Sequence, residues 1–201
     1  MTGNPIFTIG HSTHSWEAFA RLLSQHRVDS LADVRSVPAS RFNPQFNRFA
    51  LSASLHDVGI GYVFCGEELG GRPQDPACYE NGRVRYDRMA ETSTFRHGLA
   101  SLKAKAANQR VVLMCAEKDP LHCHRTLLVA RALANDGFDV LHVLPDGTLE
   151  THDQAMDRLL ESYDLDSEGD MFTSREEFLA QAVERQTQRV GHVDDKREQR
   201  G

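Results

Sequence analysis

The chain has 201 residues, of which 40% are hydrophobic, and its formal net charge is −6. This length and composition predict one globular domain with a proper core, and the acidic balance argues against broad, sequence-independent DNA binding. The sequence contains no apolar run long enough to span a membrane and no signal-like apolar segment at its start, so we expect a cytoplasmic protein with no membrane partner. Its four cysteines do not indicate a disulfide framework in that location.

Apolar and periodic segments alternate along the chain. Short apolar runs predict strands at residues 6–9, 31–34, 60–64, 111–114 and 140–144. Capping residues and helical periodicity predict helices at residues 15–27, 48–58, 86–107 (interrupted at 92–94), 120–135, 151–163 and 176–188. Residues 36–47 and 66–81 have no clear period and predict long loops, which are often functional.

This alternation predicts an α/β domain with a mainly parallel sheet flanked by helices, a Rossmann-like three-layer fold, over residues 1–163. Residues 164–201 are polar and mixed in charge, and they predict a C-terminal extension that is partly helical or disordered, with disorder expected from residue 191.

The most unusual stretch runs from Cys115 to Arg125 and reads C-A-E-K-D-P-L-H-C-H-R. It follows the buried run 111–114, and Asp119 followed by Pro120 is typical of a helix start. We therefore expect Cys115 at the carboxyl end of a strand, and Cys123 and the two residues after it in the first turns of a helix. The free N–H groups of a helix N-terminus favour thiolates and anions.

Three separated motifs resemble the domain-of-unknown-function family 488. They are Ile9-Gly10-His11-Ser12, Asp33-Val34-Arg35-Ser36-Val37-Pro38, and the set Cys115, Glu117, Pro120, Cys123, His124 and Arg125. The resemblance extends over roughly residues 6 to 145. It implies an α/β fold and a polar site, and the family name assigns no reaction.

Polar side chains follow three of the predicted strands. His11 and Ser12 come after the first, Asp33 and Arg35 come after the second, and Cys115 ends a later one. Ligand sites of parallel sheets form beyond the carboxyl ends of the strands. We therefore expect these residues to meet at one edge of the sheet.

The favoured hypothesis is an enzyme that acts on an anionic small molecule, such as a nucleotide. Cys115 would be a nucleophile or a redox centre, with an imidazole as base and an arginine holding the anion. The candidate catalytic residues are Cys115, His11, Glu117, Cys123 and His124. The candidate substrate-binding residues are Ser12, Asp33, Arg35, Arg41 and Arg125. Glu117 is either an acid–base group or an exposed loop carboxylate.

The order strand, cysteine, loop, helix is loosely like phosphatase and rhodanese sites. Those phosphatases have arginine six positions after the cysteine, whereas this chain has Leu121 there. A simple phosphatase is therefore not favoured. Cys115 and Cys123 also lack the C-x-x-C spacing of common redox pairs.

The alternative is a non-catalytic module that binds a metal or a nucleic acid. Cys115, Cys123 and a histidine are suitable ligands for zinc or iron, although the spacing matches no standard zinc motif. On a helix, Cys123 and His124 would point about 100° apart, which disfavours both binding one metal.

Nucleic acid is a less favoured partner. Arginines and aromatic residues share the loop that follows the second strand: Arg35, Arg41, Phe42, Phe46 and Arg48. Such a mixture grips phosphates and stacks bases, or its aromatic residues anchor the loop in the core. The sequence indicates neither a substrate nor an oligomeric state.

Overall fold

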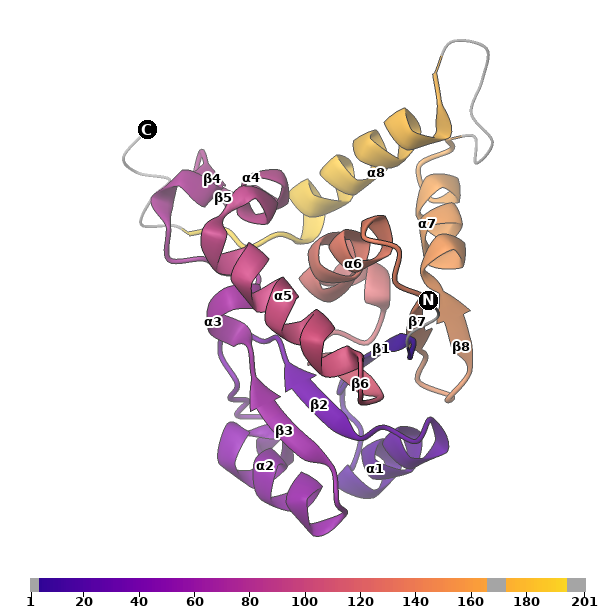
Figure 1. Cartoon of the computed structure of the whole chain (residues 1–201). Helices are drawn as coiled ribbons and strands as arrows, with labels where there is room; N and C mark the ends of the chain where they lie inside the picture. The colour runs from indigo at the N-terminus through magenta and orange to yellow at the C-terminus, as the bar shows by residue number, and fades with distance from the viewer. Residues whose placement is uncertain (1–3, 166–172, 195–201) are drawn as a thin grey trace.

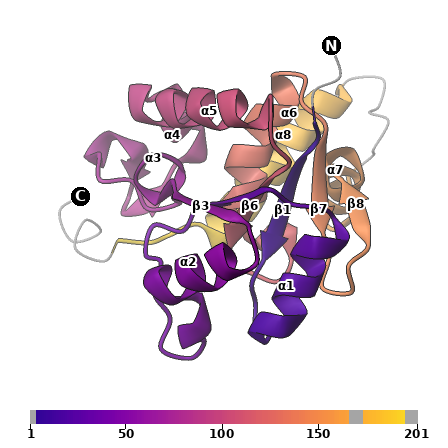
Figure 2. The same ribbon diagram turned by 60° about the horizontal axis from the view of Figure 1, so that its bottom comes forward.

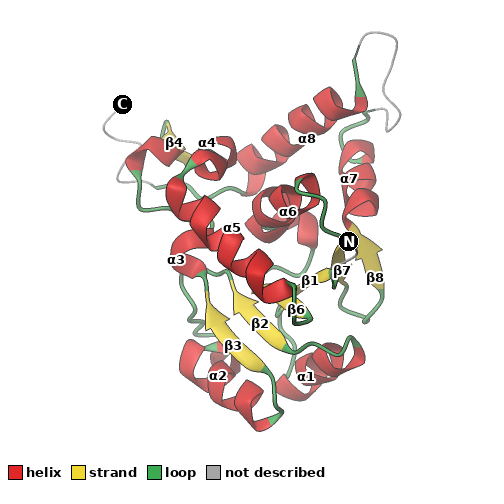
Figure 3. Cartoon of the chain, in the orientation of Figure 1, coloured by secondary structure: helices red, strands yellow, loops and turns green. Residues whose placement is uncertain are grey.

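A six-stranded sheet forms the centre of the protein (Figures 1 and 3). The structure is a computed structural model, and it describes residues 4–165 and 173–194. The strands run in the order β3-β2-β6-β1-β7-β8, and all are parallel except β8, which is antiparallel to β7. Their bounds are β1 (Ile6–Gly10), β2 (Ser30–Asp33), β3 (Gly61–Phe64), β6 (Val111–Cys115), β7 (Val140–Val143) and β8 (Leu149–Thr151). The sequence predicted all of these strands except β8.

Helices cover both faces of this sheet, which confirms the predicted three-layer α/β fold (Figure 2). One face carries α1 (Trp16–Gln25) and α2 (Arg48–Asp57), and the other carries α5 (Ser93–Ala106), α6 (Arg131–Asn135) and α8 (Arg175–Val190). The remaining elements are α3 (Gly66–Leu69), α4 (Tyr86–Glu91), α7 (His152–Glu161) and the small hairpin of β4 (Tyr79–Glu80) and β5 (Arg83–Val84). No helix in the described part of the chain has the length and apolar character needed to cross a membrane.

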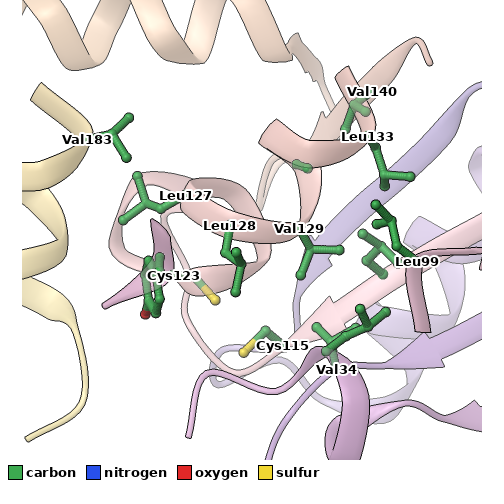
Figure 4. Close-up of a cluster of buried hydrophobic side chains, with 14 of the residues drawn as sticks. Val34, Leu99, Cys115, Cys123, Leu127, Leu128, Val129, Leu133, Val140 and Val183 are labelled. Atoms are coloured by element: carbon green, nitrogen blue, oxygen red, sulfur yellow. The ribbon is translucent and has the colours of Figure 1, made fainter. Parts of the chain in front are cut away.

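The core has two parts, one on each face of the sheet, because successive side chains of a strand point to opposite faces. In β6, Val112 and Met114 pack with the residues of α1 and α2. Leu113 and Cys115 pack on the other face, with residues of α5, the segment before α6, and α8. The strand period therefore places the thiol of Cys115 on the α5–α6 face (Figure 4).

The two predicted long loops contain short helical turns. The first includes a 3₁₀ turn at Pro44–Phe46, in which Phe46 is completely buried. The second includes α3 and a 3₁₀ turn at Pro76–Cys78. The predicted break at residues 92–94 is confirmed, because the Thr92 hydroxyl accepts from the N–H of Phe95 and starts α5.

The helix predicted over residues 120–135 does not begin where we expected. Asp119 accepts a hydrogen bond from Leu121 N, but the turn that it starts is a single 3₁₀ turn, Pro120–His122. Cys123 is extended, with φ −142° and ψ 140°, and only after it does the chain enter a π-helix, Arg125–Ala130, followed by α6. Every residue of this π-helix is buried, so packing on the sheet sets its register more strongly than the capping signal does.

The C-terminal part of the chain packs against the domain. Helix α8 begins with a capping box of Ser174 and Glu177, and it buries Ala182 and Val183. Residues 191–194, which we expected to be disordered, instead pair with the hairpin: Val84 N donates to the carbonyl oxygen of residue 192 at 3.0 Å. The rest of the extension, residues 166–172 and 195–201, lies outside the described residues.

Candidate functional site

The carboxyl ends of three adjacent strands, β2, β6 and β1, form the candidate site. Main-chain hydrogen bonds join the segments beyond them: His11 N donates to Cys115 O and Ser12 N to Ala116 O, both at 2.9 Å. Val34 N donates to Met114 O at 3.1 Å. Helices α1 and α6 lie on opposite faces of the sheet, so the chain turns in opposite directions as it leaves β1 and β6 (Figure 2). Open α/β sheets bind ligands at the point where neighbouring strands diverge in this way.

Gly10 allows the loop after β6 to pack directly against the end of β1. A Cβ atom on Gly10 would lie 1.8 Å from the carbonyl oxygen of Glu117 and 3.3 Å from Nη1 of Arg125. The next turn is also unusual, because Ser12 adopts a left-handed backbone with φ +46°. Non-glycine residues at positive φ are uncommon and concentrate at functional sites.

Cys115, Cys123 and His124 form a buried cluster, which we call the cysteine–histidine cluster. Their ligand atoms all lie within 4.8 Å of one another. The Nδ1 atom of His124 is 3.9 Å from Sγ of Cys115 and 3.7 Å from Sγ of Cys123. The expectation that Cys123 and His124 would point apart is wrong, because Cys123 is extended and only His124 has helical dihedrals. Figure 4 shows both sulfur atoms in the space between β6 and the π-helix.

The imidazole of His124 is fixed from two sides. Its Nε2 lies 2.8 Å from the carbonyl oxygen of Val34, which assigns the proton to Nε2 and turns Nδ1 toward the sulfur atoms. Gly71 packs on the ring, and a Cβ atom there would lie 2.8 Å from Cγ of His124. In the sequence, only a Gly-Gly pair in a long loop marks the position of this contact.

The three cluster residues shift one another's pKa values. The hydrogen bond to Cys123, together with burial, raises the pKa of Cys115 well above its usual value. Burial also disfavours ionisation of Cys123, but the hydrogen bond from Cys115 and the charges of His124 and Arg125 hold the pKa of Cys123 well below its usual value. Burial opposes charge on His124, and the Cys123 thiolate overcomes it and raises the pKa of His124. The N–H of Arg125 donates to Sγ of Cys123 at 3.5 Å.

A cavity of about 200 Å³ opens onto this cluster, and we call it the cysteine pocket. It is lined by all three cluster residues and by Arg35, Ser36, Val37, Gly71, Arg72, Tyr86, Ala116, Glu117, His122, Val190 and His192. The sequence did not indicate Arg72, Tyr86 or His192, which come from segments without a recognisable motif, whereas His122 belongs to the Cys115–Arg125 stretch and was one of the possible metal ligands. Burial, followed by the charge of Cys123, raises the pKa of Tyr86, so its phenol stays protonated.

Arg35 is held rigidly at the edge of this pocket. Its Nε and Nη2 donate to the two oxygens of Asp33 at 2.9 and 2.7 Å, and Nη2 also donates to the carbonyl oxygen of Phe46 at 2.8 Å. Its Nη1 donates to Nε2 of His11 at 3.2 Å. Arg35 is only 5% exposed, and its guanidinium is paired with Asp33, yet Arg35 lines the cysteine pocket and so remains a candidate group for binding an anion there.

The contacts of His11 differ from those expected of a catalytic base, which needs a ring nitrogen that is free to accept a proton. Its Nδ1 is 2.9 Å from the carbonyl oxygen of Ser12, its Nε2 accepts from Arg35, and its ring stacks on Phe46 at 4.4 Å. Burial lowers the pKa of His11 to about 4, so the ring is neutral near pH 7. Both nitrogens are occupied, and this geometry makes His11 a positioning residue for Arg35.

A second cavity, of about 380 Å³, lies beside the first, and we call it the His11 pocket. His11, Ser12 and Lys118 line it, and Arg35 and Glu117 line both pockets. Glu117, which is exposed, therefore lies on the boundary between the two cavities.

The structure does not bring the other candidates into either pocket. Arg125 is 1% exposed, and its Nη1 donates to the carbonyl oxygen of Glu117 at 2.7 Å, so it holds the loop after β6. Asp33 is buried behind Arg35. Arg41 is exposed and lines neither pocket. Of the loop aromatics, Phe46 anchors in the core, whereas 89% of Phe42 is exposed.

Comparison with known proteins agrees with the sequence motifs. A family model described as "Domain of unknown function DUF488" matches residues 15–132. No curated protein and no solved structure matched the chain. The matched residues are fewer than the 6–145 expected: they contain the cysteine–histidine cluster and Arg35, and they exclude His11 and α8. Because the match covers more than half of its length, the chain belongs to the domain-of-unknown-function family DUF488.

Proposed function

We propose that this protein is a metal-assisted enzyme that acts on a small anionic substrate. Cys115, Cys123 and His124 would bind the metal, with zinc favoured over iron because two thiolates and one imidazole are common zinc ligands. The observation that carries the proposal is the convergence of three buried donor atoms within 4.8 Å of one another.

The distances in the cluster agree with zinc coordination. In a tetrahedral site with Zn–S of about 2.3 Å and Zn–N of about 2.0 Å, a sulfur and a nitrogen ligand lie about 3.5 Å apart. The two sulfur–nitrogen distances here are 3.9 and 3.7 Å, so shifts of a few tenths of an ångström would bring these two pairs of atoms to that spacing. The bond from His124 to Val34 O is the kind of outer contact that orients metal-binding histidines.

An enzymatic role, rather than a structural one, is supported by the cysteine pocket. Structural zinc sites have four protein ligands, whereas catalytic sites have three and an open position. All three donors line a cavity large enough for a small molecule, and so does Arg35. An anionic group on the substrate would bind Arg35, and Glu117, which also lines the cavity, would accept or return a proton.

Metal analysis of the full-length protein tests this proposal. Untagged protein is purified without chelator as the wild type, Cys115→Ala, Cys123→Ala and His124→Ala. The matched control is Cys65→Ala, since Cys65 is a partly buried cysteine outside the cluster. We expect near-stoichiometric metal in the wild type and in the control, and loss of most of it in the three cluster variants.

A cobalt-substituted sample then tests the open position. Thiolate-to-cobalt charge-transfer absorption would report cysteine coordination, and inorganic phosphate should shift the visible bands if a ligand reaches the metal. Bands that do not respond to phosphate or other small anions would indicate a closed, structural site and would contradict the enzymatic part of the proposal.

The second candidate is a thiol-dependent enzyme without a metal. It is favoured by the position of Cys123, whose Sγ lies beside Nδ1 of His124 and accepts the N–H of Arg125. Protein that contains no metal, with Cys123 alkylated faster than Cys65, would select this candidate over the first.

A further inference from the structure

The C-terminal segment Val190–Asp194 reaches the candidate site from the far end of the chain. Val190 and His192 line the cysteine pocket together with the cysteine–histidine cluster. Both residues lie outside the part of the chain that matches the family model, which ends at residue 132. The pocket is therefore completed by a segment that family membership does not account for.

Several bonds hold this segment in place. Val84 N donates to the carbonyl oxygen of His192 at 3.0 Å, and Asp194 N donates to that of Gly82 at 2.8 Å. The ring of His192 packs edge-on against the ring of Tyr79, with centroids 6.5 Å apart.

Helix α8, which precedes the segment, is tied to the turn before Cys123. The side-chain amide of Gln186 donates to the carbonyl oxygen of Leu121 at 2.8 Å, and Gln186 is only 3% exposed. The segment Val190–Asp194 and the turn before Cys123 are thus connected through α8.

The pocket has a predominantly basic lining around the cluster. Arg35, Arg72, His122 and His192 are among its lining residues. Glu117 is the one carboxylate among the described lining residues. Such a lining suits a compact anion that makes charge-assisted hydrogen bonds to several donors.

We propose that Val190–Asp194 is the outer wall of the cysteine pocket and that His192 hydrogen-bonds the anionic group of the substrate there. This inference rests on the proposed function, because it assumes that the pocket binds a small anion. His192 is thus a substrate-binding residue, and the fixed segment limits the size of what enters.

Gly191 offers a way to move the wall without altering His192. A Cβ atom on Gly191 would lie 2.5 Å from the carbonyl oxygen of Thr187, in the last turn of α8, and 3.0 Å from Cγ1 of Val84. Gly191→Ala should therefore displace the segment from β5, whereas His192→Ala removes only the ring.

The experiment measures iodoacetamide alkylation of Cys115 and Cys123 in full-length, chelator-treated protein, with and without inorganic phosphate. We expect phosphate to slow alkylation of the wild type. His192→Ala should raise the phosphate concentration that gives half-maximal protection about three- to tenfold, which is the effect of one lost hydrogen bond. His192→Gln should restore part of the protection.

Gly191→Ala should accelerate alkylation several-fold in the absence of phosphate. His97→Ala, at an exposed position on α5, is the control and should match the wild type.

Equal phosphate protection in the wild type and His192→Ala, or no protection in the wild type, would overturn the contact between His192 and the anion. An unchanged alkylation rate in Gly191→Ala would overturn the wall. Thermal unfolding of each variant shows whether it is folded. Metal content is measured separately on untreated protein, so a failure of the proposed function is distinguishable from a failure of this inference.

Discussion

His124 and Val34 are joined by a hydrogen bond of 2.8 Å between the imidazole Nε2 and a main-chain carbonyl oxygen. Val34 N in turn donates to Met114 O, so the imidazole is fixed to the ends of β2 and β6. Because the acceptor belongs to the main chain, a side-chain substitution at Val34 does not remove it. The ring orientation depends instead on what packs against the imidazole.

Gly71→Ala should weaken metal binding without removing a ligand. The added methyl group would lie 2.8 Å from Cγ of His124 and would displace the ring from its present position. Changes in groups that orient ligands reduce metal affinity by about 10- to 100-fold, and we expect a loss of roughly tenfold. Competition with a chromophoric zinc chelator measures it. Gly61→Ala, where the nearest neighbour would be at 3.4 Å, should retain the wild-type affinity.

Gly10→Ala should destabilise the protein and displace the loop that carries Glu117. A Cβ atom would lie 1.8 Å from the main-chain oxygen of Glu117, and backbone on both sides leaves little room to adjust. Overpacking of this kind costs about 1–3 kcal/mol, and here we expect the upper end of that range. Urea unfolding gives the difference in free energy. A loss below about 0.5 kcal/mol would show that the loop relaxes freely.

Asp33→Ala should be among the most destabilising substitutions at the site. The carboxylate is fully buried, pairs with Nε and Nη2 of Arg35, and accepts from the Tyr62 hydroxyl at 2.9 Å. Removing one member of a buried ion pair leaves an uncompensated charge and costs about 3–5 kcal/mol. Asp57→Ala, at a carboxylate that is 81% exposed, is the control for urea unfolding and should change stability little.

Buried histidines should make the protein sensitive to acid. Burial lowers the pKa of His11 and of His152 to about 4, and it holds the pKa of His142 well below its usual value. The folded pKa values are lower than those of the unfolded chain, so the unfolded state binds protons first as the pH falls. The stability these groups contribute is complete above pH 6.5 or so and is lost progressively toward pH 4.

The pair formed by His142 and His152 allows a direct check of this acid sensitivity. Their Nε2 and Nδ1 atoms are 3.3 Å apart, and Nδ1 of His142 is 2.7 Å from the Thr8 hydroxyl. Replacing His152 by glutamine should reduce the loss of unfolding free energy between pH 7 and pH 5. His56→Gln, at a side chain that is 90% exposed, should leave that loss unchanged. The same pH dependence in both variants would contradict the assignment.

The sequence predicted most of the sheet and the main helices because their signals are local. Apolar runs mark β1, β2, β3, β6 and β7, and Thr92 marks the start of α5. It also predicted that the segments after β1, β2 and β6 meet, since the carboxyl ends of parallel strands share one edge. Strand β8 was not predicted, because only one of its three residues is apolar.

Local signals failed where two of them competed. Asp119 and Pro120 mark a genuine turn start, but the buried π-helix that follows sets its own register. Cys123 is extended as a result, and this conformation, which helical spacing argued against, brings Cys123 and His124 together around Cys115. No spacing rule in the sequence contains that information.

The α/β layering and the presence of thiols, imidazoles and guanidinium groups at one edge of the sheet thus follow from the sequence alone. The contacts that these groups make depend on the folded structure. Arg35 is hydrogen-bonded to Asp33, to His11 and to the carbonyl oxygen of Phe46. Two of the candidate site residues, Asp33 and His11, therefore orient Arg35. His192 joined the pocket through pairing with β5, far along the chain. Such roles depend on contacts between residues distant in sequence, which periodicity and capping do not encode.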